Sequence, residues 1–220
     1  MAISFPRTDV FSSVGFATNE FYLQARNQLS RQANGRSRSK SLGPQLWNGS
    51  WGSVPRDHDV ILDLEAILNS LEDGIFTFYA GDLRRQYPRE YPTGVFADTA
   101  KIQTVGGNYK SLVINSAPAN FKISRGDYFH FNFTDPVTSD PIRYLGQVME
   151  TVTCNGSGVS PSFEVRPHLN TSDISGQALV FKKPTGVFKL VNGSVKVTQV
   201  DVMKSTVSFS AYQSLIVGDL

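Results

Sequence analysis

Three histidines and one cysteine are the side chains of this 220-residue chain best suited to metal binding or nucleophilic chemistry. His58, His130, His168 and Cys154 form none of the His-x-x-x-His or Cys-x-x-Cys spacings that zinc sites use. Cys154 has no second cysteine with which to form an internal disulfide. We therefore interpret the histidines as surface or structural residues and the cysteine as a small, semi-buried hydrophobic residue.

Motifs for nucleotide binding and for nucleophilic catalysis are also absent from the sequence. No G-x-x-x-x-G-K-[ST] or G-x-G-x-x-G segment opens a helix, and no G-x-S-x-G turn presents a serine. The glycine-rich residues 155–158 are followed by Val-Ser-Pro-Ser, which is a poor start for a helix with free amide groups. The sequence thus predicts a protein that is not an enzyme and that carries no metal or cofactor.

Basic residues gather between positions 24 and 56, a segment without a single acidic residue. Asn34-Gly35 predicts a two-residue turn, which places the surrounding basic residues on a hairpin. Three interpretations remain open: a solvated edge that resists aggregation, a charged contact between neighbouring subunits of a ring, and a nucleic-acid surface. A formal net charge of +2 and the lack of interleaved aromatic residues argue against specific nucleic-acid binding. The basic residues concerned are Arg26, Arg31, Arg36, Arg38 and Lys40.

The hydrophobic pattern predicts a mainly β chain with one strong helix. Apolar residues recur at three- and four-residue spacings between Val60 and Leu71, which is typical of an amphipathic helix covering one face of a sheet. The other apolar segments are short or alternating and are bounded by glycine, proline and asparagine. Residues 16–24, 37–41 and 46–54 are expected to form a three-stranded antiparallel meander.

Residues 84–92 divide the chain, because their prolines and polar side chains predict an exposed connection between two domains. The strands and turns beyond residue 100 suit a small β-barrel, with Phe129, Phe131 and Phe133 on one strand face. The alternating hairpin at residues 195–215 follows the barrel, and we expect it to return and pair with the N-terminal strands.

The order of several short motifs resembles the distal tail proteins of siphophages, which belong to the tail tip of tailed phages. In the first half, the motifs are Ile3-Ser-Phe-Pro6, Asn34-Gly-Arg36, Leu42-Gly-Pro44 and Leu83-Arg-Arg-Gln-Tyr-Pro88. In the second half, they are Ile123-Ser-Arg-Gly-Asp127, Tyr144-Leu-Gly-Gln-Val148 and Lys183-Pro-Thr-Gly186.

This resemblance implies an antiparallel sheet domain with one covering helix, formed by residues 1–98 with 191–220. It implies an inserted small β-barrel domain of OB-like type, formed by residues 99–190. The implied function is a structural ring, a hexameric homo-oligomer, that links the tail tube protein to the hub or baseplate protein. The tape-measure protein is a further candidate partner. The expected location is the virion tail, assembled in the bacterial host cytoplasm, with no membrane association because no apolar run is long enough to span a bilayer.

Two segments are the expected interfaces of such a ring: the basic hairpin and the arginine- and tyrosine-rich residues 84–91. Two alternative functions stay open. One is a tail hub or tail-completion protein of different symmetry, and the other is a carbohydrate- or receptor-binding tail module built on Trp51, Tyr79, Tyr87 and Tyr91. The expected interface residues are Arg31, Arg36, Arg38, Lys40, Arg84, Arg85, Tyr87, Arg89 and Tyr91.

Overall fold

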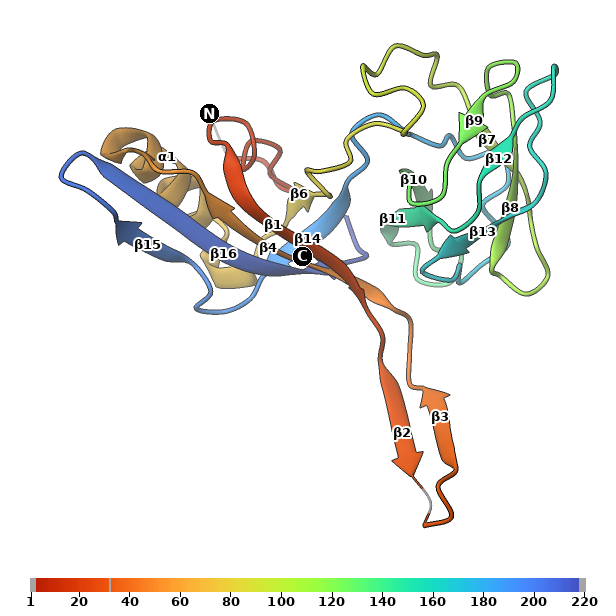
Figure 1. Cartoon of the computed structure of the whole chain (residues 1–220), viewed down its shortest axis with the longest axis horizontal. Helices are drawn as coiled ribbons and strands as arrows, with labels where there is room; N and C mark the ends of the chain where they lie inside the picture. Colours follow the sequence, from red (N-terminus) through yellow and green to blue (C-terminus); the bar gives the residue numbers. More distant parts are fainter. Residues whose placement is uncertain (1–2, 32, 218–220) are drawn as a thin grey trace.

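The structure, a computed structural model, describes residues 3–31 and 33–217. The chain is mainly β, as the sequence predicts, and its sheets are antiparallel. Two sheet-based units lie side by side along the longest axis of the molecule, and a two-stranded hairpin projects away from both of them (Figure 1). The first unit carries the helix, and the second is built from residues in the middle of the chain.

The sheet of the first unit has the strand order β1-β4-β16-β14-β6. Its central strand β16 pairs with β4, so that Phe209 lies opposite Trp51, and β15 and β5 add short pairings along β16. This pairing confirms that the last hairpin returns to the N-terminal strands. The strands are β1 (Phe16–Gln24), β4 (Leu46–Ser53), β5 (Arg56–Asp57), β6 (Phe78–Ala80), β14 (Gly186–Leu190), β15 (Lys196–Gln199) and β16 (Lys204–Ser214).

Strand β14 corrects the expected extent of the barrel, because residues 186–190 are predicted from the sequence to lie in the second unit. β14 instead pairs with β6 and β16 in the first sheet. Val187 and Phe188 are both fully buried, although they point to opposite faces of the strand. A strand that is buried on both faces lacks the alternation of apolar and polar residues from which its buried face could be inferred. The sequence pattern therefore does not indicate to which of the two sheets β14 belongs.

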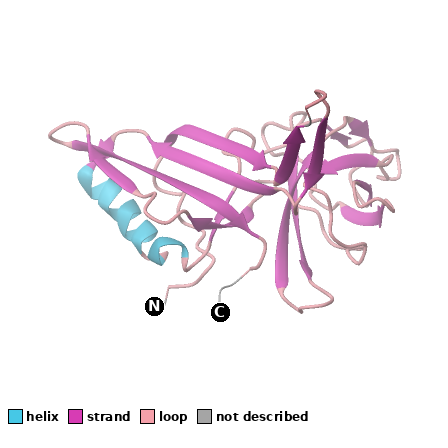
Figure 2. Cartoon of the chain, turned by 90° about the horizontal axis from the view of Figure 1, so that it is seen from below, coloured by secondary structure: helices cyan, strands magenta, loops and turns pink. Residues whose placement is uncertain are grey.

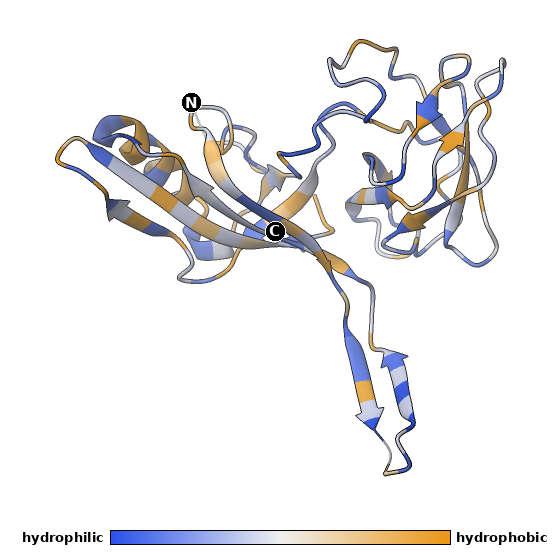
Figure 3. Ribbon diagram, in the orientation of Figure 1, coloured by the Kyte–Doolittle hydropathy of each residue, from blue (hydrophilic) through white to orange (hydrophobic). Residues whose placement is uncertain are grey.

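The helix α1 (His58–Asn69) covers one face of this sheet (Figure 2), as expected. Its apolar stripe buries Ile61, Leu64 and Leu68 against a cluster that includes Trp51 and Phe209. A short 3-10 turn, η1 (Glu72–Gly74), leads the chain from the helix back to the sheet. No element among the described residues covers the opposite face of the sheet, where β4 and β16 place the less buried residues of their alternating patterns. The hydropathy colours of the ribbon also change from residue to residue along β16 (Figure 3).

The second unit is a five-stranded half-barrel with the strand order β10-β11-β13-β8-β7. Residues 176–181 bridge its two edge strands: His130 and Val180 exchange backbone hydrogen bonds of 3.0 and 2.9 Å, and Leu179 N donates to Ala100 O over 2.9 Å. A small ladder of β9 (Lys122–Ile123) and β12 (Val152–Thr153) closes one end. The five strands are β7 (Lys101–Val105), β8 (Ser111–Asn115), β10 (Tyr128–Thr134), β11 (Pro141–Val148) and β13 (Phe163–Arg166).

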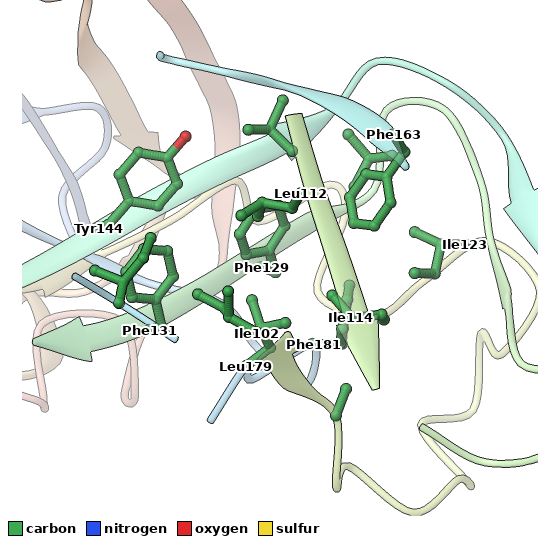
Figure 4. Packing of buried hydrophobic residues seen from close by; sticks show 14 of the residues in the cluster. Ile102, Leu112, Ile114, Ile123, Phe129, Phe131, Tyr144, Phe163, Leu179 and Phe181 are labelled. Atoms are coloured by element: carbon green, nitrogen blue, oxygen red, sulfur yellow. The ribbon is translucent and has the colours of Figure 1, made fainter. Parts of the chain in front are cut away.

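Strand β10 faces both units, and this explains its burial. Phe129, Phe131 and Phe133 point into the half-barrel, where they pack with the residues shown in Figure 4, as the alternation predicts. Tyr128 and His130 point the other way, toward the first unit, and they are also buried. The outer face of β10 is therefore an interior surface of the molecule at Tyr128 and His130, whereas Asn132 and Thr134 further along the strand are exposed.

Buried contacts join the two units. Trp47 Nε1 donates a 2.8 Å hydrogen bond to the carbonyl of Leu145, and the Tyr128 hydroxyl donates to Asp82 Oδ2 over 3.3 Å. The Tyr128 ring packs edge-on against Trp47, with 5.5 Å between ring centroids. The pKa of Tyr128 is raised above its ordinary value, chiefly by burial and then by the neighbouring Asp82 carboxylate. The phenol thus stays protonated and keeps donating to Asp82.

A fully buried carboxylate, Asp127, fixes the segment that connects the units. It accepts hydrogen bonds from Arg85 Nη1 at 3.2 Å, from the Arg89 amide at 3.0 Å and from the Ser124 amide at 2.8 Å. A buried carboxylate is stable only when donors of this kind replace its lost hydration. Asp127 therefore ties the connecting segment to the start of β10.

Removing the Asp127 carboxylate should destabilise the chain strongly. In Asp127→Ala, the Arg85 guanidinium and two amides lose their acceptor, so the free energy of unfolding should fall by about 3 kcal/mol. Chemical denaturation measures this loss. The matched control is Asp173→Ala, which removes an exposed carboxylate and should change stability by less than about 0.5 kcal/mol. Equal stability of the two variants would contradict the structural role of Asp127.

Candidate assembly surfaces

The basic hairpin is a separate arm. Its strands β2 (Asn27–Arg31) and β3 (Ser37–Ser41) pair only with each other among the described strands, and they continue the ribbon of β1 and β4 away from the body (Figure 1). The expected three-stranded meander is therefore wrong, because β3 does not join the main sheet. Between the two ladders, residues 42–45 oppose only residues 25–26, an irregularity that turns the arm away from the sheet.

Every described residue of β2 and β3 is exposed. Leu29, the one large apolar side chain on the two strands, is 60% exposed and rests on no hydrophobic core. An isolated two-stranded hairpin is marginally stable in water because it buries so little surface. The arm consequently gains little stability from its own chain, and contact with another surface would order it.

The pairing register sets which arm residues share a face. Arg38 lies opposite Ser30 and Lys40 opposite Gln28, so these two cations point to the same side. They are two residues apart on an extended strand, which separates them by about 6.6 to 6.8 Å. Arg31 points to the other face, opposite Ser37. Both faces of the arm therefore carry positive charge, and none of the arm's cations forms an ion pair with another described residue.

Residues 84–91, the second expected interface, are not the freely exposed connection that their composition predicts. Arg84 pairs in a bidentate manner with Asp82 at 2.9 Å, and Arg85 pairs with Asp127. Tyr91 stacks on Phe121 with 4.8 Å between ring centroids. Composition alone cannot distinguish prolines and arginines that face solvent from ones that contact a neighbouring domain. The segment therefore connects the two units as predicted, but only part of it is exposed.

Some polar groups of this connecting segment do remain accessible. The Arg84 side chain is 61% exposed despite its ion pair, and Arg89 and Glu90 are exposed. Tyr87 is partly buried. The segment can still contribute to a contact at its rim, while its central residues hold the two units together.

The four aromatic residues proposed as a sugar platform do not form a shared exposed surface. Trp51 is fully buried beneath α1, and Tyr91 packs against the half-barrel core. The Arg143 guanidinium covers the Tyr79 ring at 4.1 Å from its centroid. Carbohydrate recognition through stacked, exposed aromatic rings thus has no counterpart at these positions.

The side chains best suited to metal binding or nucleophilic chemistry have structural roles here. His58 bonds to Ser205 Oγ and to the carbonyl of Val202, both at 2.8 Å, and burial raises the pKa of the Cys154 thiol. Over the described residues, no group of three or more His, Cys, Asp and Glu side chains could hold a metal ion. Within the same residues, no helix is long and apolar enough to cross a membrane.

The uncovered face of the main sheet is a further candidate surface, beyond the two segments that the sequence predicts. Across β1, β4 and residues 206–212 of β16, Glu20 is the one charged side chain on this face among the described residues, and lysines appear on the flanking β14 and β15. In the sequence, this face is indicated by the alternation of serine, threonine, asparagine and glutamine with apolar residues along these strands. The remaining residues of this face are Thr18, Tyr22, Gln24, Leu46, Asn48, Ser50, Gly52, Thr206, Ser208, Ser210 and Tyr212.

No protein-family model matches this sequence, and no curated protein is significantly similar to it.

His130 makes the stability of the fold depend on pH. Its Nδ1 accepts a 3.2 Å hydrogen bond from the Thr185 amide, and burial, with a smaller effect of Arg143, lowers its pKa to about 3. The ordinary histidine pKa is 6.5, so between pH 6.5 and 3 the unfolded chain binds a proton that the folded chain does not. Full stability is therefore present above pH 6.5 and is lost as the pH falls.

We expect the free energy of unfolding contributed by this site to decline below pH 6.5 with a slope approaching about 1.4 kcal/mol per pH unit. The His130→Asn variant keeps a side-chain acceptor and lacks the titrating group. Denaturation of both proteins from pH 7.5 to 4 measures the difference in slope. Parallel profiles for the two proteins would show that His130 does not carry the effect.

The arm should be the least protected ordered segment of an isolated chain. Because its strand pairs cover no core, their amide hydrogens should exchange much faster than those of β4 and β16 at dilutions where single chains dominate. On self-association, the arm amides should become protected while those of β15 change little. Hydrogen–deuterium exchange with mass spectrometry follows both segments. Slow exchange in the arm of the single chain would contradict this description.

Proposed function

We propose that this chain is a non-catalytic structural subunit of a phage tail tip, a distal tail protein that forms a ring linking the tail tube to the hub or baseplate. The arm is the observation that carries the proposal. It is a basic β-hairpin that projects beyond the body, and its two strands, exposed at every described residue, pair with no other described strand. Such an element fits a protein whose final contacts are made with neighbouring subunits.

A closed ring requires two different surfaces on each subunit, one that reaches forward and one that receives. The projecting arm supplies the first, and the body of the chain must supply the second. Positive charge on the arm favours an acidic receiving surface and speeds the encounter. A compact monomeric binding module would have no use for this asymmetry, which is why we favour a ring subunit.

The uncovered sheet face supports the same proposal. A channel that conducts nucleic acid must not retain it, and retention comes mainly from lysine and arginine side chains that neutralise phosphates. Strands β1 and β4 and residues 206–212 of β16 present mainly hydroxyl and amide side chains there, with Glu20 as the charged group among these residues, and the lysines lie at the margins, on β14, β15 and the first residue of β16. We propose that this face lines the lumen and that the half-barrel, as an OB-like insertion, decorates the outside of the ring.

The proposed partners are further copies of the chain, in a hexameric homo-oligomer, the tail tube protein, the hub or baseplate protein and the tape-measure protein. The proposed location is the virion tail, assembled in the host cytoplasm. A tail hub or tail-completion protein remains the alternative, since an arm of this kind also suits a trimer. The mass of the assembly separates the alternatives: six copies support the distal tail protein, and three support a hub.

Deletion of the arm tests the proposal. In the variant, residues 27–41 are replaced by two glycines, which should leave the fold intact because the arm covers no core. Wild-type protein at low salt should sediment as a ring, and the variant should sediment as a single chain with an unchanged circular dichroism spectrum. The control is Lys101→Glu/Arg125→Glu, which reverses two exposed cations on the half-barrel and should assemble normally. Normal assembly of the deletion variant would refute the role of the arm.

A further inference from the structure

Opposite charges are segregated into two adjacent stretches of this chain. Residues 25–56 contain six basic residues and no acidic one, and five of the six lie in or next to the arm. Residues 57–83, which include α1, contain seven carboxylates and neither lysine nor arginine. A formal net charge of only +2 hides this separation. The carboxylates are Asp57, Asp59, Asp63, Glu65, Glu72, Asp73 and Asp82.

The helix presents its acidic residues to solvent. Asp59 and Asp63 are exposed on the outer side of α1, and Leu62 between them is 57% exposed. Glu72 and Asp73 extend the exposed acidic surface past the end of the helix. None of these carboxylates forms an ion pair with a described residue, and of their oxygens only Asp73 Oδ1 accepts a hydrogen bond there, from the Gly193 amide. We call Asp59, Leu62, Asp63, Glu72 and Asp73 the acidic face.

The charges on the two surfaces have matching spacings. Asp59 and Asp63 are four residues apart on a helix, which separates them by about 6 Å along its axis. Arg38 and Lys40 are about 6.6 to 6.8 Å apart on one face of β3. Each cation of the arm can therefore meet one carboxylate of the helix, while the exposed Leu62 side chain packs against the aliphatic stems of the cations. Charge and shape thus favour the same pairing.

The arm and the acidic face cannot pair within one chain. The arm continues from the first residue of β4, whereas α1 follows the last residue of β4 after the short strand β5. The eight residues of β4 separate the two ends of the strand by about 25 Å. Figure 1 shows the arm and α1 leaving this strand at opposite ends, with the arm directed away from the helix. Each surface of the pair must find its partner on another molecule.

We infer that the arm of one copy docks on the acidic face of α1 in a second copy, an inference that rests on the proposed role of the arm in assembly. The contact joins two different surfaces, so each copy gives its arm to one neighbour and receives an arm from the other. Repetition of such a contact closes a ring when the rotation between copies allows closure. Because exposed charges carry much of the contact, added salt weakens it.

A charge swap between two variants tests the inference. The first variant, Arg38→Glu/Lys40→Glu, has an acidic arm and the native helix. The second, Asp59→Lys/Asp63→Lys, has the native arm and a basic helix face. Each variant alone meets like charge at every contact, so its self-association measured by sedimentation velocity at low salt should weaken by about tenfold or more. Circular dichroism and thermal unfolding check that both variants are folded.

An equimolar mixture of the two variants should assemble again. The acidic arm of the first variant then meets the basic helix of the second, and the basic arm of the second meets the acidic helix of the first. Recovery of wild-type mass, with the two variants in equal amounts, supports the inference. The control mixture contains the second variant and Lys101→Glu/Arg125→Glu, which has no acidic arm. In this mixture, contacts between two copies of the second variant should stay as weak as in the second variant alone.

The remaining outcomes separate this inference from the proposed function. If the arm variant dissociates while the helix variant assembles like the wild type, the acidic face is not the receiving surface, but the arm still drives assembly. If the helix variant dissociates and the mixture does not recover, direct pairing of the two surfaces is refuted. If the arm variant assembles normally, or if wild-type protein stays a single chain at every salt concentration, both proposals are overturned.

Discussion

Burial of Trp47 and Trp51, the two inward-facing tryptophans of β4, is the interaction on which the rest of the structure depends. Trp51 lies at the centre of the first unit under α1, and Trp47 reaches the second unit through its hydrogen bond to Leu145. One strand thus anchors the helix, the main sheet and the half-barrel. Large aromatic side chains suit this role because each buries much apolar area, and the indole N–H of Trp47 also donates a hydrogen bond across the junction.

The position of β4 also arranges the surfaces. Its first residue continues into the basic arm and its last residues lead to the acidic helix, so the length of one strand keeps opposite charges apart in a single molecule. The same strand contributes polar side chains to the uncovered sheet face. A subunit with two different, separated surfaces favours head-to-tail contacts, because the surface that docks on one neighbour differs from the surface on which the other neighbour docks.

Local patterns predicted much of the fold, and long-range contacts account for the failures. The apolar stripe from Val60 to Leu71 located α1, and the alternation after residue 195 led correctly to the β16–β4 pairing. The position of β14 and the burial of His130 were missed, because both lie between the two units and no local periodicity encodes that junction. Asn34-Gly35 correctly indicated a hairpin, but the expected two-residue turn is wrong: Arg31 lies opposite Ser37, one residue away from the register of such a turn, and of the two turn residues only Gly35 has a positive φ. The separation of the hairpin from the sheet depends on the irregular residues 42–45.

Single-particle electron microscopy of the wild-type chain at low salt tests the central claim most directly. The account predicts a closed ring in which each arm lies along α1 of the next subunit and the uncovered sheet faces line the lumen. Isolated single chains, or an assembly in which the arms project freely into solvent, would contradict it.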